Sequence, residues 1–308
     1  MKLKNKSLLT LVILAAGAAL AGCGAKAEPA PAPTSAAETA AAAVSETAAA
    51  AGESKAAGEI EVSVFAAASL TSIMEEFEKG FESEHPGTDI LLNTDSSGKL
   101  LAQIHEGAPC DLFFSAGQSQ VNALEDEGML VEGTRKNVVN NQLIVITQPD
   151  SATKVTGLKD IGSAESIALA DGSVPVGRYT RIAMIKLGLL PETDKPEAYT
   201  TEDISKALGG VEISEQGNVS KVRTAVEEGS CEVGTVYYSD IYRHEDRVKV
   251  LEVVSYDVSG NIIYPVCMVK NEDANSSQTE AAKAFLEYIT GEDAKKLYQK
   301  YLFDTDVE

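Results

Sequence analysis

Short apolar runs alternate with amphipathic segments along most of the chain, from about residue 60 onward. The apolar-rich run at 60–66 is typical of a buried strand, and the apolar residues after it recur at helical spacing, at Leu70, Ile73, Met74, Phe77 and Phe81. The same succession predicts strands at 89–92, 112–114, 143–147, 167–170, 233–237, 248–253 and 262–269, and helices at 99–105, 119–127, 178–187, 219–228, 275–289 and 292–301. Strands that alternate with crossover helices predict an α/β fold of mainly parallel sheets with helices on both faces.

The alternating elements fall into two groups, and no Gly/Pro-rich linker separates them. This organisation predicts two lobes joined by crossing strands, near 140–143 and again near 264–266. We expect lobe I to comprise 59–140 plus 265–308, and lobe II to comprise 141–264.

The N-terminal segment has the pattern of an export signal, with Lys2, Lys4 and Lys6 before an apolar run at 8–20. That run is too short and too Gly-interrupted to favour the alternative, a transmembrane anchor. It ends in Leu-Ala-Gly-Cys, which matches the bacterial lipobox. We therefore predict a signal peptide at 1–22 and lipid on Cys23, such as diacylglycerol and palmitate, which would anchor an exported protein to the outer face of the cell membrane.

The segment from 23 to 58 is expected to be a spacer between this anchor and the lobes. After Cys23 it consists mainly of Ala, Glu, Pro, Ser, Thr and Gly, with one Val and no aromatic residue. Such a composition buries too little apolar surface to offset the entropy of ordering the chain.

Charge and cysteine content exclude several classes of function. A formal net charge of −21 disfavours nucleic acid and anionic lipid surfaces as partners. With Cys23 acylated, Cys110, Cys231 and Cys267 remain, an odd number that disfavours a disulfide framework. No CxxC pair is present and the 3 histidines have no metal-ligand spacing, so we expect neither a zinc nor a redox site.

Two strand-to-helix turns in lobe I carry serines. In parallel α/β sheets, ligands bind beyond the carboxyl ends of strands, where helix N-termini present free N–H groups. Ser69 follows the strand at 60–66, and Ser97 follows the strand at 89–92. Ser69 is interpreted first as a helix N-cap and the turn of Ser97 as another capped helix start, although a hydroxyl beside free N–H groups can also bind an anionic oxygen. No glycine precedes Ser97 at Walker A spacing, so a nucleotide-phosphate loop is not expected.

Lobe II has comparable turns. Pro175 and Gly177 flank Val176 and would expose its amide at a helix start, and Val219 heads the next helix. Tyr237 ends a predicted strand and is a core aromatic by default, although its phenol can donate into a cleft.

The order of these turns along the chain resembles the molybdate-binding proteins of bacterial ABC importers, over essentially all of 59–302. The matching stretches are FAAASLTSIMEEFE, SSGKLLAQIHEGAPCDLFFSA, NNQLIVIT, LADGSVPVGRYTRIAMIKLG, GNVSKVRTAVEEGSCEVGTVYYSD and IIYPVCMVK. The resemblance implies a two-lobed periplasmic-binding-protein fold of type II, with the ligand in the interlobe cleft and no enzymatic activity.

The resemblance also implies which residues contact the oxyanion: Ser69 and Ser97 from lobe I, and the Val176 amide, the Val219 amide and the Tyr237 hydroxyl from lobe II. It implies binding without a metal ion, a counter-charge or a cofactor. Molybdate or tungstate is itself the transported ligand. The implied partners are a membrane permease of an ABC importer and the membrane itself through the lipid anchor. We expect a monomer.

Alternatives remain open at this point. Sulfate or phosphate could be the ligand, and an inward-facing Asp95 would favour hydrogen phosphate by accepting its proton. We expect Asp95 to point away and cap its turn, Lys99 and Arg178 to lie on solvated helix faces, and Cys110, where the family usually has a smaller residue, to be a buried apolar thiol. A serine hydrolase would need a G-x-S-x-G turn, which is missing. A scaffold lipoprotein would not need polar turns at so many strand ends.

Overall fold

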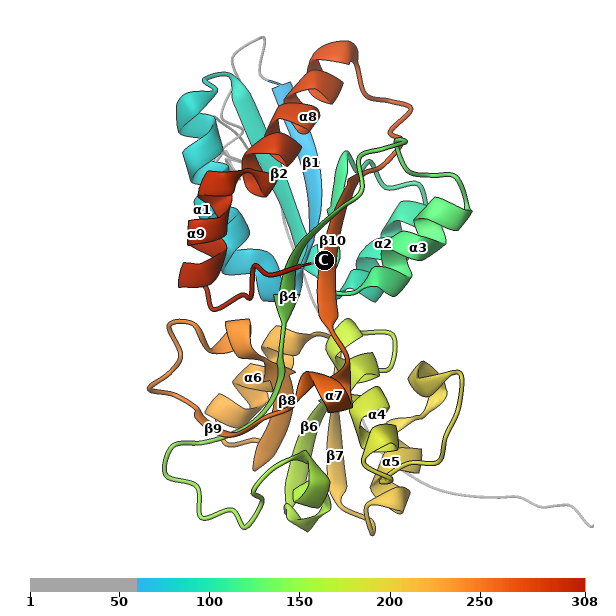
Figure 1. Cartoon of the computed structure of the whole chain (residues 1–308), viewed down its shortest axis with the longest axis vertical. Helices are drawn as coiled ribbons and strands as arrows, with labels where there is room; N and C mark the ends of the chain where they lie inside the picture. Colours follow the sequence, from blue (N-terminus) through green and yellow to red (C-terminus); the bar gives the residue numbers. More distant parts are fainter. Residues whose placement is uncertain (1–59, 308) are drawn as a thin grey trace, which may run out of the picture. The chain divides into compact units, whose positions relative to one another are not determined.

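The computed structural model describes residues 60–307 and places them in two sheets with flanking helices (Figure 1). The predicted signal peptide, Cys23 and the spacer lie outside the described residues. Within 60–307, no helix has the length and apolar character that crossing a membrane requires.

The sheet of lobe I is five-stranded, in the order β2-β1-β3-β10-β4. Its strands are β1 (Ile60–Ala67), β2 (Thr88–Asp95), β3 (Leu112–Phe114), β4 (Lys136–Asn141) and β10 (Ile262–Met268). β1 pairs with β2 and β3 in parallel, whereas β10 is antiparallel to both of its neighbours. The strand that opposes the others is the one that returns from lobe II.

The sheet of lobe II repeats this arrangement, in the order β7-β6-β8-β5-β9. Its strands are β5 (Leu143–Thr147), β6 (Ser166–Ala170), β7 (Glu212–Gln216), β8 (Val233–Tyr237) and β9 (Lys249–Val253). β6 is parallel to β7 and β8, and β5, which arrives from lobe I, is antiparallel to β8 and β9. Each sheet is thus mainly parallel with one reversed strand, and the two-lobed α/β prediction is confirmed.

Helices cover the sheets. Those of lobe I are α1 (Thr71–Glu84), α2 (Ser97–His105), α3 (Gln118–Asp126), α8 (Ser276–Thr290) and α9 (Glu292–Lys300). Those of lobe II are α4 (Pro175–Lys186), α5 (Thr201–Ala207), α6 (Val219–Glu227) and α7 (Tyr256–Ser259). Short 3-10 turns follow β1 (η1, Ala68–Leu70) and β8 (η4, Tyr238–Ile241), at the same strand ends that carry two of the predicted site residues.

Alternating side chains of β3 show how the lobe I sheet is buried on both faces. Phe113 packs in one cluster with Leu100 of α2 and Val121 of α3. Phe114 points the other way, into the main core with Phe77 of α1 and residues of α8 and α9. Cys110 is buried in the smaller cluster, and burial raises the pKa of its thiol well above the usual value, as expected for an apolar, unreactive cysteine.

Two strands, β4 and β7, and two short helices, α5 and α7, were not predicted from the sequence. β4 and β7 carry polar side chains, as in Lys136, Asn140 and Glu212, and both are edge strands. An edge strand pairs on one side only and needs fewer apolar residues, so its pattern is weak. α5 is a short helix that begins with a capping box formed by Thr200 and Asp203.

The chain crosses between the lobes twice, and these crossings lie side by side because β4 pairs with β10 (Figure 1). The first crossing runs from β4 through Gln142 into β5, and the second leads from β9 through α7 into β10. The lobe boundaries that we propose, at 140/141 and 264/265, fall inside β4 and β10. Short parallel connections of this kind allow two lobes to rotate about one axis.

Candidate oxyanion-binding site

A small cavity lies where strand ends and helix N-termini of both lobes meet. The empty space in it, including the solvent at its mouth, is about 200 Å³. It is lined by Ala67, Ala68, Ser69, Ser96, Ser97 and Ala116 from lobe I, and by Val174, Pro175, Val176, Val219 and Tyr237 from lobe II. The structure thus brings all the sequence-predicted site residues to one cavity, and none of the lining residues carries a charge. That these residues contact a ligand stays a prediction.

Ser97 is the first residue of α2, and its hydroxyl is aimed by a backbone contact. The N-cap of α2 is Ser96, whose Oγ accepts from the Lys99 amide, so this turn is a capped helix start with Ser96 as the cap. The Oγ of the fully buried Ser97 instead accepts from the Ala116 amide at 3.0 Å. Because this contact uses an oxygen lone pair, the hydroxyl proton remains for an acceptor in the cavity.

Ser69 lies in η1, and its Oγ is 2.9 Å from the Tyr264 hydroxyl. The N-caps of η1 and α1 are Ala67 and Leu70, so the interpretation of Ser69 as an N-cap is wrong. The Oδ1 of Asn141, at the first crossing, accepts from the amides of Gln142 and Ser239, which fixes Nδ2 as the donor to the Tyr264 oxygen at 3.1 Å. In the arrangement in which Tyr264 donates its own proton to Ser69, the Ser69 proton is left to point toward a ligand.

Asn141 and Tyr264 were not predicted to take part in the site. They lie on the crossing strands β4 and β10, and both are buried. Their positions at the predicted crossings were the available signal, because a polar group buried at a hinge needs a partner.

Two backbone amides come from helix starts in lobe II. α4 begins at Pro175 and α6 at Val219, so the Val176 and Val219 amides belong to first turns whose N–H groups have no intrahelical acceptor. The first turn of α4 approaches the end of β6 so closely that a Cβ on Gly177 would lie 2.1 Å from the Asp171 carbonyl oxygen. Glycine is therefore required at 177 to hold Val176 at the cavity.

Tyr237 is the last residue of β8 and is 1% exposed. Its ring meets the Tyr264 ring edge to face, with centroids 5.8 Å apart. Its hydroxyl is buried and has no hydrogen-bond partner in the described part of the chain, an arrangement that costs free energy in a folded protein. Burial raises the pKa of Tyr237 well above its usual value, so the phenol stays protonated and remains a donor.

A larger cavity adjoins the first and shares Ala68 and Ser69 with it. Its empty space, including the solvent at its mouth, is about 790 Å³. Its lining includes charged groups, among them Arg223 and the buried Asp240. Burial raises the pKa of Asp240 to about 7, and its Oδ2 accepts from the Tyr237 amide. We place the site in the smaller cavity because its lining is uncharged and includes the buried Tyr237 hydroxyl, which has no hydrogen-bond partner among the described residues.

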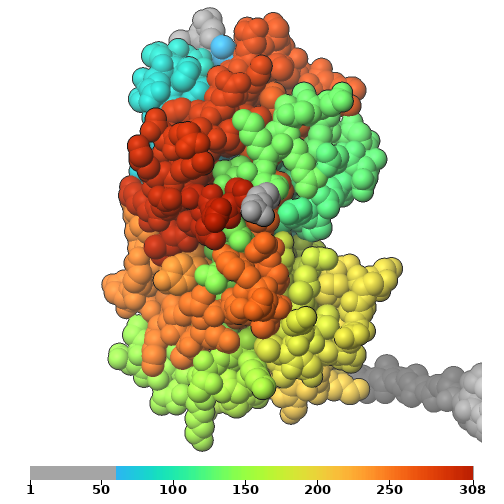
Figure 2. All heavy atoms as spheres, viewed as in Figure 1, coloured from blue at the N-terminus to red at the C-terminus, as the bar shows by residue number. Residues whose placement is uncertain are grey.

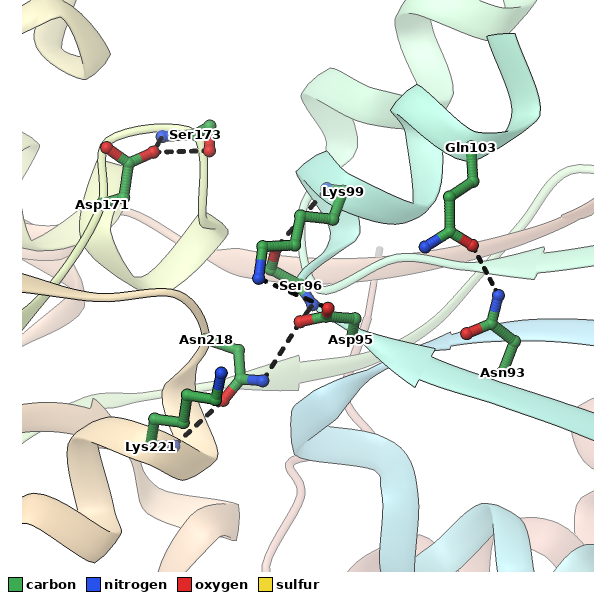
Figure 3. Close-up of polar contacts among 9 residues, drawn as sticks. All are labelled: Asn93, Asp95, Ser96, Lys99, Gln103, Asp171, Ser173, Asn218 and Lys221. Carbon is green, nitrogen blue, oxygen red and sulfur yellow. Dashed lines mark hydrogen bonds and ion pairs between the residues drawn. The ribbon is translucent and has the colours of Figure 1, made fainter. Parts of the chain in front are cut away.

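Asp95 bridges the two lobes instead of facing the cavity (Figure 3). Its Oδ1 accepts from its neighbour Ser96 (amide, 2.7 Å) and from Asn218 Nδ2 in lobe II (3.1 Å), and Lys99 Nζ lies 3.4 Å from Oδ2. Burial alone raises the pKa of Asp95, but the hydrogen bonds from Asn218 and Ser96 and the charge of Lys99 outweigh it and lower that pKa. The carboxylate is thus ionised and fully engaged outside the cavity.

Further contacts show that the two lobes are closed on each other. A Cβ on Gly98 would lie 2.5 Å from the Ser173 carbonyl oxygen of lobe II. The Tyr242 ring of lobe II packs on the Tyr301 ring of lobe I, with centroids 4.2 Å apart, and Arg243 lies over both rings. In Figure 2 the red surface of residues near 300 abuts the orange surface of lobe II on this face.

The Asp95–Asn218 contact predicts a charge-dependent effect on affinity. Asn218→Asp keeps an N-cap acceptor for the Lys221 amide but places two carboxylates together, so closure is disfavoured. We expect ligand affinity to fall about tenfold in calorimetric titration. Adding Asp95→Asn restores a donor–acceptor pair, and the double variant is expected to regain most of the affinity. Equal affinities of the parent and the single variant would show that the contact does not contribute to closure.

Comparison with known proteins agrees with this architecture. Residues 62–304 match the family model described as bacterial extracellular solute-binding protein. The molybdate-binding protein ModA of Escherichia coli is 32% identical over 257 residues, covering 80% of this chain and 90% of that protein. A putative ABC transporter substrate-binding lipoprotein of Bacillus subtilis, YvgL, is 28% identical over 249 residues, covering 80% of this chain and 88% of that protein.

A solved structure extends the likeness to three dimensions. The substrate-binding domain of a putative molybdenum ABC transporter from Clostridium difficile is 31% identical, with a TM-score of 0.57 and coverage of 80% of this chain and 99% of that one. The chain therefore belongs to the bacterial extracellular solute-binding protein family, together with its molybdate-binding relatives.

Proposed function

We propose that the protein captures molybdate, and also tungstate, outside the cytoplasm and delivers it to the permease of an ABC importer. The observation that carries the proposal is an uncharged cavity where Ser69 and Ser97 of lobe I meet the first turns of α4 and α6, and where the buried Tyr237 hydroxyl has no hydrogen-bond partner among the described residues. The names of the relatives that match over most of their length support the same ligand and the same transport system.

The donor set suits a tetrahedral dianion. Such an ion offers only acceptors, and each charge-assisted hydrogen bond contributes about 1.5–3 kcal/mol. The first turns of α4 and α6 add favourable partial charge to their Val176 and Val219 amides. A site without Lys or Arg in contact with the ion also avoids the desolvation of a second charge.

Phosphate and sulfate are less well served by this lining. Hydrogen phosphate carries a proton that needs an acceptor, and the lining holds no carboxylate because Asp95 is engaged with Asn218 and Ser96. Sulfate is smaller than molybdate, so donors fixed in a rigid closed cavity reach it less well. Titration, described below, separates these ions.

A serine hydrolase is not supported by the surroundings of the serines. Among residues 60–307 the histidines contact other groups: His85 the Phe81 carbonyl, His105 the Glu127 carboxylate and His244 the Glu227 carboxylate. Ser69 and Ser97 instead contact Tyr264 and the Ala116 amide. A serine without a base in contact is not activated as a nucleophile.

Lipid on Cys23 and the spacer at 23–58 complete the proposal. A lipid-anchored receptor stays near its importer instead of diffusing away, and the spacer between the anchor and the lobes lets the monomeric receptor reach the permease. This part rests on the lipobox and on composition alone.

Calorimetric titration of a soluble form that starts after Cys23 tests the ligand. We expect tight, saturable binding of molybdate and tungstate, and no measurable heat with sulfate or phosphate at the same concentrations. Tight binding of phosphate without binding of molybdate would show that the proposal is wrong.

A further inference from the structure

A charged side chain lies buried behind the wall of the cavity. Arg181, in the second turn of α4, is 0% exposed. Its Nε donates to the Tyr199 carbonyl oxygen at 2.8 Å, and its Nη1 donates to those of Ala170 and Gly177 at 2.9 Å each. Its Nη2 is buried without a hydrogen-bond partner. An arginine stays protonated in proteins, so a full positive charge lies inside lobe II.

No carboxylate balances this charge directly. The three acceptors are neutral carbonyls, and no ion pair to Arg181 forms within the described part of the chain. Asp171 and Glu215 act on it only through longer-range attraction, and burial lowers its pKa. Burying a charge that no carboxylate contacts is unfavourable, so its presence needs a reason beyond packing.

The contacts of Arg181 place the charge next to the site. Ala170 is the last residue of β6, and Gly177 lies in the first turn of α4, directly after Val176. A Cβ on Gly177 would lie 2.5 Å from the Ala170 carbonyl oxygen, so strand end and helix start are in direct contact there. The Nη1 group bridges these two segments, immediately behind the amide that lines the cavity.

We propose that Arg181 is a specificity-determining residue, whose buried charge favours divalent over monovalent tetrahedral oxyanions without touching them. The inference rests on the proposed function. Coulomb attraction scales with the charge of the ligand and is weakly screened where water is excluded, so a dianion gains about twice as much as a monoanion. Arg181 is in this sense a positioned electrostatic group, because it is held by carbonyls and needs no reorganisation when the ion enters.

A purely structural role makes a different prediction. If Arg181 only fastens α4 to β6, its loss misplaces the Val176 amide and weakens every oxyanion by a similar factor. Two ions of nearly equal size and different charge therefore separate the interpretations: molybdate, a dianion, and perrhenate, a monoanion.

The experiment is calorimetric titration of both ions into the parent, Arg181→Lys and Arg181→Gln. Glutamine removes the charge but can still donate to a carbonyl, and lysine keeps the charge without the guanidinium. We expect Arg181→Gln to lower the molybdate-to-perrhenate affinity ratio about tenfold, and Arg181→Lys to keep that ratio within about threefold of the parent. Circular dichroism melting checks the fold, and Arg181→Met is the second neutral variant if Arg181→Gln unfolds.

The outcomes are distinguishable. An unchanged ratio in the neutral variant, with both affinities reduced alike, overturns the role of Arg181 and leaves the proposed function intact. A parent that binds neither ion overturns the proposed function, and this inference with it.

Discussion

Tyr237→Phe is expected to weaken molybdate binding about 10- to 100-fold while the free protein loses no stability. The phenol hydroxyl is buried and has no hydrogen-bond partner within residues 60–307, so it is available to donate to a ligand. Removing one charge-assisted hydrogen bond worth about 1.5–3 kcal/mol gives the expected loss. Phenylalanine keeps the edge-to-face contact with Tyr264, and it removes an unsatisfied polar group from the core.

Ser97→Ala is the matched comparison, because its hydroxyl is also expected to donate to the ligand but has a structural partner as well. Its Oγ accepts from the Ala116 amide, which alanine leaves unsatisfied, so this variant should lose both affinity and stability. Titration gives the affinities, and thermal unfolding without ligand gives the stabilities. Parent-like binding by Tyr237→Phe would exclude the phenol from the site, and a lower melting temperature would show that its hydroxyl has a partner.

The convergence of the site could be predicted because it depends on a general property of parallel sheets. Ser69, Ser97, Val176 and Val219 lie at strand-to-helix turns, and carboxyl ends of parallel strands share one edge of a sheet. Tyr237 ends β8, at the corresponding edge of lobe II. Local sequence therefore marked these strand ends and helix starts as candidates, and the resemblance to the molybdate-binding family selected the five residues among them.

The partners that aim the donors could not be predicted in this way. Which serine caps α2 depends on backbone geometry at one residue, and Ser96 and Ser97 are identical in type. The surroundings of the Ser69 hydroxyl depend on two contacts between distant residues. Ser69 and Tyr264 are 195 residues apart in the sequence, and Tyr264 and Asn141 are 123 apart. Contacts of such separation leave no local pattern.

Local sequence also does not reveal which charged residues near the site are buried. Arg178 pairs with Glu197 at a partly exposed helix face, and Lys99 is 47% exposed, as the amphipathic pattern predicts. Arg181 lies three residues beyond Arg178 and has the same side chain, yet it is fully buried. Its acceptors include the carbonyl of Tyr199, from a separate segment, so the sequence of α4 alone does not distinguish the two arginines.

Gly98→Ala is expected to lower molybdate affinity at least about 100-fold, because it opposes closure of the lobes. A Cβ at this position would lie 2.5 Å from the Ser173 carbonyl oxygen, and a backbone atom of the opposite lobe cannot move aside as a side-chain end can. If the lobes stay apart, Val176, Val219 and Tyr237 no longer reach an ion held by lobe I. α2 itself should gain about 0.5–1 kcal/mol from alanine in place of glycine, so the free protein is not destabilised.

Gly80→Ala is the control for this variant, since its Cβ would also meet another atom at 2.5 Å, the Tyr288 hydroxyl. That contact lies within lobe I, between α1 and α8, and involves the far end of a side chain that can rotate away. Calorimetric titration of both variants should show parent-like affinity for Gly80→Ala and the large loss only for Gly98→Ala. Equal affinities for all three proteins would mean that the ligand is bound without the close approach of α2 to Ser173, and lobe closure would then not be what assembles the donor set.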